Sequence, residues 1–332
     1  MSLKITNDLL VKIEKAEVFS YPFEHYIIEN FLPEEVLNNV HEFFKTWQTL
    51  PTKDTPPNGR LSIGLGKKYS DQSFEMEYQQ YLSSVIDWKL IVRNLIQKFE
   101  NGTNPELLRL MEDGTGCVIR STEEELQNLR KGRRAFNIDV QPGMNPQGFA
   151  GLEPHIDAHH KLIASLLYID LGKGVHRYGG DLLLHSAGPG TRFHKNTINP
   201  WYSAEPVKRV EFKDNRLVVI LNSNIAIHSV EAFIPPKNTT PPYPRCLINI
   251  IAEASSTDYL AYDPRELPQS LREKVFGVLI GSIMLPLVYF RSRVDKRFRK
   301  MFRSSVTWSR TVSNWKHLGR QNYTNWRKIL KL

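Results

Sequence analysis

Hydrophobic positions follow a helical period early in the chain and an alternating period in its middle. A short strand is predicted over Glu24–Asn30, and Pro33 with the two acids that follow it is typical of a helix start. The apolar residues after Pro33 recur every three or four positions, as on one helix face: Val36, Leu37, Val40, Phe43 and Phe44. We therefore predict that residues 1–132 form a mainly helical support with an entry strand.

From Arg133 onward, apolar and polar residues alternate, which is the period of β-strands. Clusters of Gly and Pro separate the predicted strands, which are Arg134–Gln141, Leu162–Leu171, Gly180–His185, Val207–Phe212, Arg216–Leu221, Ala226–Val230 and Arg245–Glu253. Many short strands after a helical start are typical of a jelly roll or barrel. We predict an α+β fold, in which helices brace a jelly-roll core (a double-stranded β-helix) over residues 133–255.

The formal net charge of +9 is concentrated at the C-terminal end. Residues 291–332 contain 13 Lys and Arg and a single acid, Asp295, and an uncharged run of 16 residues, 275–290, precedes them. That run is shorter than the roughly 18 residues expected of a membrane-spanning helix. We expect residues 256–332 to form a helical, basic extension. Peripheral contact of residues 275–332 with an anionic membrane is one interpretation; a solvated cationic helix, or one packed on a partner subunit, stays open.

Two cysteines, Cys117 and Cys246, provide no disulfide framework. Charged residues interrupt the first 30 positions, so no apolar segment typical of a secretory signal stands there. We expect a cytoplasmic protein, at the periphery of a membrane if the basic extension adsorbs to one.

A candidate metal site stands at His155-Ile156-Asp157. At a strand end, residues two apart project to the same side, so this imidazole and this carboxylate can converge on one cation. A third ligand must come from elsewhere, and His228 is the best candidate. Two histidines and one carboxylate on one face of an octahedron are typical of non-haem Fe(II) oxygenases.

With these ligands, the sequence resembles the 2-oxoglutarate/Fe(II) oxygenase superfamily in its prolyl-hydroxylase-like branch. The resemblance covers roughly residues 20–255 and rests on an ordered set of segments: His155-x-Asp157, Gly179–Leu182, Arg216–Val219, His228–Val230 and Arg245. It implies a dioxygenase that holds Fe(II) with His155, Asp157 and His228. It further implies 2-oxoglutarate and O2 as co-substrates, with release of succinate and CO2 during hydroxylation of a small-molecule or peptide substrate.

Arg245 is the residue that the resemblance implies for the distal carboxylate of 2-oxoglutarate, which a guanidinium can bind through two charge-assisted hydrogen bonds. Tyr168 could offer a hydroxyl to the same carboxylate. Asn137 and Gln141 share a strand face and could contact the 2-oxo acid or the substrate, and Asn249 lies on the same face as Arg245.

Other interpretations stay open beside the oxygenase. The core could be a catalytically inactive jelly roll that binds a metal or ligand, or a scaffold whose basic tail binds an anionic surface. His155 and His159 have the spacing of a zinc-protease helix but lack the glutamate that follows the first histidine. The nucleic-acid-demethylating branch carries a second arginine six residues after the first, where this chain has Ile251, so nucleic acid is not an expected partner.

Four further histidines and two loop-rich segments complete the candidates. We expect His159 and His160 to lie at the pocket rim or in solvent, and His185 and His194 at the surface or on the substrate side. Residues 51–75 and 185–205 are expected to shape substrate entry, and the basic residues in them, Arg192 and Lys195 among others, suit an anionic substrate. The sequence fixes neither the substrate nor the oligomeric state.

Overall fold

The structure is a computed structural model that describes much of the first 262 residues. The described residues are 2–47, 61–62, 81–82, 84–99, 117–119, 136–145, 151–172, 178–187, 191, 193–194, 197–198, 204–234, 244–254 and 261–262. Residues 1–191 and 195–267 form one compact unit, and residues 192–194 and 268–332 form another. The expected basic extension, with its membrane contact over 275–332, and the residues Arg192 and Lys195 lie outside the described residues. The predicted boundaries near 132 and 255 stay predictions.

Helices in the described part are α1 (Ser2–Lys15), α2 (Glu34–Trp47) and α4 (Trp88–Gln97). The predicted helix after Pro33 is confirmed as α2. Asp87 caps α4 through a hydrogen bond from the Leu90 backbone N–H, 3.0 Å long, which satisfies a donor that has no partner within the helix. None of the described helices is both long and apolar enough to cross a membrane.

The larger sheet of the compact unit has the strand order β1-β2-β12-β7-β14-β5-β3, and β4 pairs with β5 in parallel. Its strands are β1 (Val18–Phe19), β2 (His25–Ile28), β3 (Leu61–Ser62), β4 (Cys117–Ile119), β5 (Phe136–Asn145), β7 (Lys161–Ile169), β12 (Leu217–Leu221) and β14 (Arg245–Ala254). All the pairs along this order are antiparallel. β14 is the centre of the sheet, because it pairs over almost its whole length with β5 on one side and β7 on the other.

The smaller sheet runs β11-β8-β13-β6-β10 within the same unit. Its strands are β6 (Leu152–His155), β8 (Leu182–Ser186), β10 (Thr197–Ile198), β11 (Glu205–Val210) and β13 (His228–Val230). The remaining described strand, β9 (Phe193–His194), belongs to the second unit.

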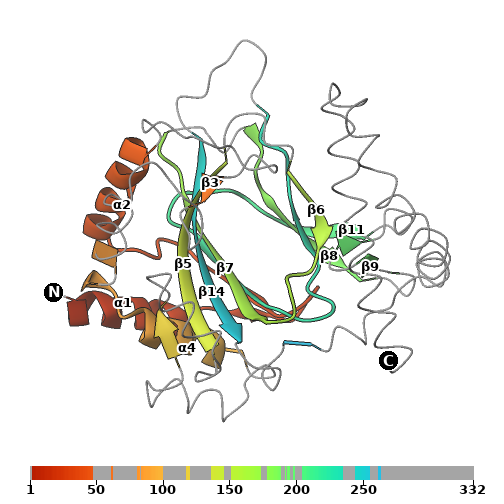
Figure 1. The fold of residues 1–332 in the computed structure, drawn as a ribbon, viewed down its shortest axis with the longest axis horizontal. Coiled ribbons are helices and arrows are strands. Elements are labelled where there is room, and N and C mark those ends of the chain that lie inside the picture. Colours follow the sequence, from red (N-terminus) through yellow and green to blue (C-terminus); the bar gives the residue numbers. More distant parts are fainter. Residues whose placement is uncertain are drawn as a thin grey trace, which may run out of the picture. The chain divides into compact units, whose positions relative to one another are not determined.

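The chain alternates between the two sheets as it proceeds. It runs from β5 in the larger sheet to β6 in the smaller, back to β7, on to β8 and β11, and then through β12, β13 and β14 in alternation. Figure 1 shows the two sheets as separate layers, with α1, α2 and α4 on the outer side of the larger sheet. The predicted α+β class is therefore confirmed, and the strand order is consistent with the predicted jelly roll.

Two apolar clusters hold the layers together. One joins the helices to the outer face of the larger sheet, with Leu9, Phe44 and Ile91 at 0% exposure. The other lies between the sheets, around Tyr168 and Phe212. β14 serves both sides because successive residues of a strand point in opposite directions. Cys246, Ile248, Ile250 and Ala252 belong to the first cluster, and the residues between them face the smaller sheet.

Several predicted boundaries were wrong. β5 continues through Pro142 and Gly143 to Asn145, four residues beyond the predicted end, since pairing with β14 overrides two residues that are typical of turns. β13 begins at His228 rather than Ala226. Helix α1 was not predicted, although Ile5, Leu9 and Ile13 recur every four residues on its buried face.

Candidate active site

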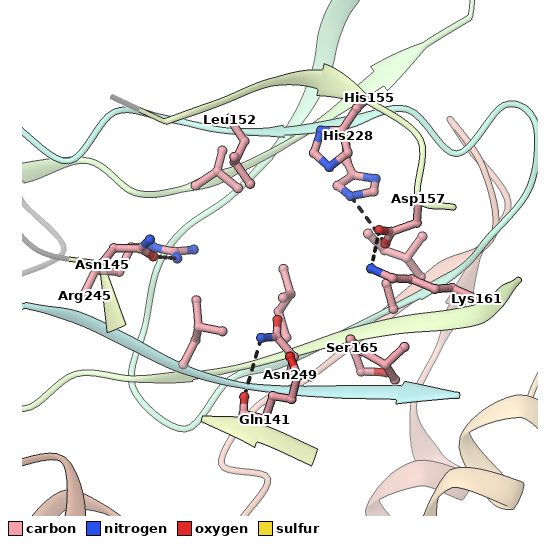
Figure 2. Close-up of a pocket in the computed structure, with 16 residues that line it drawn as sticks. Gln141, Asn145, Leu152, His155, Asp157, Lys161, Ser165, His228, Arg245 and Asn249 are labelled. Carbon is pink, nitrogen blue, oxygen red and sulfur yellow. Dashed lines mark hydrogen bonds and ion pairs between the residues drawn. The ribbon is translucent and has the colours of Figure 1, made fainter. Parts of the chain in front are cut away.

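His155, Asp157 and His228 come together because β6 and β13 are neighbours in the smaller sheet. His155 ends β6, and His228 begins β13 directly opposite it in the antiparallel pair. Their rings lie 4.5 Å apart, and Asp157 Oδ2 lies 3.9 Å from His228 Nε2. One potential ligand atom from each residue lies within 4.8 Å of the others. The three predicted metal ligands therefore form one cluster, as Figure 2 shows.

The two histidines are oriented by their own backbone. His155 Nδ1 lies 2.7 Å from the Glu153 carbonyl oxygen, and His228 Nδ1 lies 3.0 Å from that of Ala226. A carbonyl only accepts, so in each neutral ring Nδ1 donates the proton and Nε2 keeps its lone pair. Burial lowers the pKa of His228 to about 4, and the nearby His155 acts in the same direction. His228 is thus neutral at pH 7, the form that binds a metal.

Asp157 is held from both its side chain and its backbone. Lys161 Nζ lies 2.7 Å from Oδ1 of the carboxylate, and the Tyr262 hydroxyl donates to the Asp157 carbonyl at 2.7 Å. Asn222 donates to the Ala158 and Lys161 carbonyls and so fixes the loop between β6 and β7. Burial acts to raise the pKa of Asp157, but the Lys161 ammonium and the adjacent histidines outweigh it, and the pKa falls to about 2.

A cavity of about 150 Å³ lies between the two sheets and connects this cluster with Arg245. In Figure 2 the histidines and Asp157 stand at one end and Arg245 at the other. The lining residues are Gln141, Asn145, Leu152, His155, Asp157, Lys161, Ala164, Ser165, Leu166, Ile220, His228, Val230, Arg245, Leu247, Asn249 and Ile251. Asn145 and Arg245 make the far end polar, and Leu152, Leu166 and Val230 contribute apolar wall.

The Arg245 side chain is buried, at 2% exposure, and only some of its N–H groups have hydrogen-bond acceptors. Its Nε donates to the Gly180 carbonyl at 2.8 Å and its Nη1 to Asn145 Oδ1 at 2.9 Å. Its Nη2 is buried and has no hydrogen-bond partner within the described part of the chain. A buried cationic donor without an acceptor is costly, so this end of the cavity is suited to an anionic group of a ligand.

Gly180 explains how the arginine reaches its place. The residue has φ +88°, and a Cβ there would stand 2.6 Å from Arg245 Cδ. Only glycine allows both the backbone conformation and the close approach of the arginine. Gly180, in the segment Gly179–Leu182 named in the sequence, therefore supports Arg245, whereas Gly179 lies against the Ala232 carbonyl.

Tyr168 and Asn137, the other predicted co-substrate residues, are placed less directly. Tyr168 is fully buried beside Arg245, whose guanidinium carbon lies 5.2 Å from the ring centre, but Tyr168 does not line the cavity in the described part of the chain. Its hydroxyl has no hydrogen-bond partner there, and burial raises its pKa to about 12. Asn137 lies in β5 opposite Glu253, and its side chain is outside the described residues. The roles of both residues stay predictions.

The remaining histidines differ in burial and in the residues that they contact. His159 packs against the Tyr262 ring, and His160, with 43% of its side chain exposed, lies 3.8 Å from Glu253. His185 was expected at the surface or on the substrate side. It is 3% exposed and so not at the surface, it is not among the residues that line the cavity, and its Nε2 is 2.7 Å from Ser229 Oγ. This contact ties β8 to the strand that carries His228. The side chain of His194 is outside the described residues.

Sequence reasoning missed three polar residues of the cavity: Asn145, Lys161 and Ser165. Asn145 was hidden by the Pro-Gly pair before it. Lys161 and Ser165 lie on β7, and Lys161 falls four residues after Asp157 at the start of the strand. The signal that could have found Lys161 is its position, since the first residue after a ligand-bearing loop lies beside the ligands.

The donor set fits a divalent transition metal. Two imidazole nitrogens and one carboxylate oxygen converge from one side, which leaves other positions of a six-coordinate ion open. The unpartnered Nη2 of Arg245, at the other end of a narrow cavity, fits the carboxylate of a small dicarboxylic acid. The residues present therefore suit both Fe(II) and 2-oxoglutarate.

Comparisons with known proteins add only distant likenesses. No family model matches the chain, and no curated protein matches its sequence. Among solved structures, a prolyl hydroxylase of Trichoplax adhaerens in complex with a hypoxia-inducible-factor peptide is similar at 15% identity and TM-score 0.37, over 75% of this chain and 89% of that one. A prolyl-4-hydroxylase of Pseudomonas putida has 15% identity and TM-score 0.33, over 76% and 98%.

A prolyl 4-hydroxylase of Phytophthora capsici has 12% identity and TM-score 0.40, over 97% of this chain and 92% of its own. Likenesses of this size establish neither the fold nor the activity of this chain.

Proposed function

We propose that this protein is an Fe(II)- and 2-oxoglutarate-dependent oxygenase that hydroxylates a small-molecule or peptide substrate. One observation carries the proposal: a single cavity has His155, Asp157 and His228 at one end and the unpartnered guanidinium nitrogen of Arg245 at the other. A metal-binding cluster alone would fit many sites. Its combination with a buried carboxylate receptor across a narrow cavity is what a 2-oxo acid bound at a metal requires.

Each residue has a definite task in this proposal. His155 and His228 present Nε2 to the ion, because their Nδ1 atoms are engaged with backbone carbonyls. Asp157 supplies a carboxylate that stays ionised at neutral pH. Arg245 binds the distal carboxylate of 2-oxoglutarate and so fixes which end of the co-substrate faces the metal cluster.

The cavity wall controls water and orientation. Leu152 and Val230, apolar residues of the cavity wall, limit the water inside the cavity. Fe(II), when bound, would activate O2, which then oxidises both 2-oxoglutarate, to succinate and CO2, and the substrate.

The proposal is tested by anaerobic titration of the purified protein with Fe(II) and 2-oxoglutarate, monitored by the weak visible absorption of a 2-oxo acid chelated to Fe(II). Wild type is compared with His155→Ala and with the matched control His160→Ala, which removes a partly exposed histidine outside the cluster. We expect absorption in wild type and in the control but none in His155→Ala. Succinate formation from 2-oxoglutarate in air follows as the second readout.

The outcome decides between the open interpretations. If folded, iron-loaded wild type gives no such absorption and forms no succinate, the oxygenase proposal is overturned. Retained metal binding by the three clustered residues would then point to an inactive binding module.

A further inference from the structure

Lys161 is the one lysine that lines the cavity in the described part of the chain, and the proposed chemistry gives it no task. It begins β7, and its side chain turns back toward the loop that carries Asp157. The ammonium nitrogen lies 2.7 Å from Asp157 Oδ1, and 24% of the side chain is exposed. The ion pair is therefore mostly enclosed and stands beside the metal-ligand cluster.

We infer that Lys161 is an internal counter-cation that takes the place of the metal's charge in the metal-free protein and competes with the metal for Asp157. This inference rests on the proposed function, because it treats His155, Asp157 and His228 as metal ligands. Its consequence is a site that binds a divalent metal more weakly and more reversibly than its three ligands alone would.

The first support is the charge that the carboxylate needs. Asp157 has 13% of its side chain exposed, and the two histidines beside it each use Nδ1 for a backbone carbonyl. Lys161 places a full positive charge in contact with this carboxylate, and a buried charge without such compensation is strongly destabilising. Lys161 is the lysine in contact with Asp157 among the described residues, so it stabilises the fold when no metal is bound.

The second support is the geometry of the two carboxylate oxygens. Lys161 contacts Oδ1, while Oδ2 lies 3.9 Å from His228 Nε2. A cation on one oxygen withdraws electron density from the other and weakens it as a ligand. A divalent ion beside Oδ2 would also stand close to the ammonium, and their repulsion is large in a site of low effective dielectric. Both effects have the same sign: Lys161 lowers metal affinity.

The third support is the mobility that the lysine side chain allows. Unlike Arg245, which is anchored by two hydrogen bonds, Lys161 donates no other side-chain hydrogen bond that the structure shows. Its four-carbon stem can swing the ammonium toward solvent when a metal takes Asp157. Metal binding is then an exchange of one cation for another rather than a simple addition.

The experiment compares metal binding by wild type, Lys161→Met, Lys161→Arg and the control Lys213→Met. Lys213 forms an exposed ion pair with Glu29, 3.0 Å long, and lies outside the cavity. Co(II) is titrated under anaerobic conditions and followed by its visible absorption, without co-substrate. We expect Lys161→Met to bind Co(II) at least about tenfold more tightly than wild type, which is about 1.4 kcal/mol. Lys161→Arg and Lys213→Met should resemble wild type.

Thermal unfolding with and without metal provides a readout that a purely structural lysine would not give. With a chelator present, Lys161→Met should unfold at a lower temperature than wild type. Saturating Co(II) should raise its unfolding temperature more than that of wild type. A lysine that only stabilises the loop would lower both temperatures equally.

Wild type itself supplies a test if Lys161→Met fails to fold. Amine acylation of Lys161, measured by peptide mass spectrometry, should rise when Zn(II) is added and fall with chelator, whereas Lys213 should not respond. Equal or lower acylation of Lys161 with Zn(II) would overturn the inference.

The outcomes separate the inference from the proposed function. If wild type binds Co(II) through His155 and Lys161→Met binds it no more tightly, the inference alone fails. If neither protein binds Co(II), the proposed metal site fails and the inference fails with it.

Discussion

The two ends of the cavity handle charge in opposite ways. At one end the Asp157 carboxylate already has a cation, Lys161, 2.7 Å away. At the other end the Arg245 guanidinium has two neutral acceptors and one nitrogen without a partner. At the first end, which we call the closed end, a protein cation already pairs with the carboxylate. At the second, which we call the open end, two hydrogen bonds fix the guanidinium, and Nη2 is left to donate to a ligand.

Arg245→Lys should produce the largest effect, because it removes the planar fork from the open end while keeping a positive charge. A lysine cannot donate to Gly180, Asn145 and a ligand carboxylate in the same fixed geometry. We expect the concentration of 2-oxoglutarate needed for half-saturation to rise about 100-fold, on the order of 3 kcal/mol. Anaerobic titration with Fe(II) present measures it. An unchanged titration would show that the 2-oxo acid does not use Arg245.

Acid should affect the closed end before the open one. Burial lowers the pKa of His228 to about 4 from its ordinary 6.5. Between these values the unfolded chain is protonated at His228 and the folded chain is not, so the free energy of unfolding falls as the pH falls. The resulting stability is fully present above pH 6.5 and is lost as the pH falls toward 4.

The loss amounts to at most about 3 kcal/mol, at 1.36 kcal/mol for each pKa unit. Urea unfolding of the metal-free protein between pH 7 and 4 measures it. His228→Gln, which does not titrate, should lose less stability over the same range.

Gly180→Ala should disturb the open end alone. A methyl group at this position would stand 2.6 Å from Arg245 Cδ, and φ +88° is strained for alanine. We expect a loss of about 1–3 kcal/mol in the free energy of unfolding and a roughly tenfold weaker response to 2-oxoglutarate. Metal affinity measured without co-substrate is the internal control and should not change. Weakened metal binding would show that the two ends are coupled.

Tyr168→Phe should have the smallest effect. The polar neighbour of the buried hydroxyl is the Arg245 guanidinium, which keeps its hydrogen bonds to Gly180 and Asn145 when the hydroxyl is removed. We expect stability to change by less than about 1 kcal/mol. A rise of a few-fold in the 2-oxoglutarate requirement would support the predicted hydroxyl contact, and no rise would remove Tyr168 from the site.

The sequence predicted the grouping of His155, Asp157 and His228 better than the residues around them. A His-x-Asp pair at a strand end and a later histidine form a recognisable set, and the pairing of β6 with β13 brings them together. Lys161 was not predicted: its position just after the loop that carries Asp157 indicates that it lies nearby, but the direction of its long side chain depends on the folded structure. Asn145 was missed because the fold of β5 beyond Pro142 depends on pairing with β14, which lies about a hundred residues away in the chain.

In the fold, too, elements with a sequence pattern of their own were predicted, and elements that depend on distant pairing were not. Residue alternation and the Gly and Pro clusters between the segments found most strands of both sheets, although β12 and β14 are buried on both faces. They did not find the short strands β3 and β4, which exist through pairing with β5 rather than through a pattern of their own. Neither the sequence nor the structure identifies the substrate, because residues 51–75 and 185–205, which are expected to shape substrate entry, lie largely outside the described residues.

The alternation along β14 has a consequence for how such a protein can diversify. Cys246, Ile248, Ile250 and Ala252 hold the helical layer, whereas Arg245, Leu247, Asn249 and Ile251 face the cavity. Substitutions at Arg245, Asn249 and Ile251 would change the cavity wall and leave the first set in place, whereas Leu247 also belongs to the apolar cluster between the sheets. A deletion of one residue within β14 would turn the side chains beyond it to the opposite face of the sheet. Point substitutions in β14 can therefore change which ligand the cavity binds, whereas a change in the length of the strand would disrupt the fold.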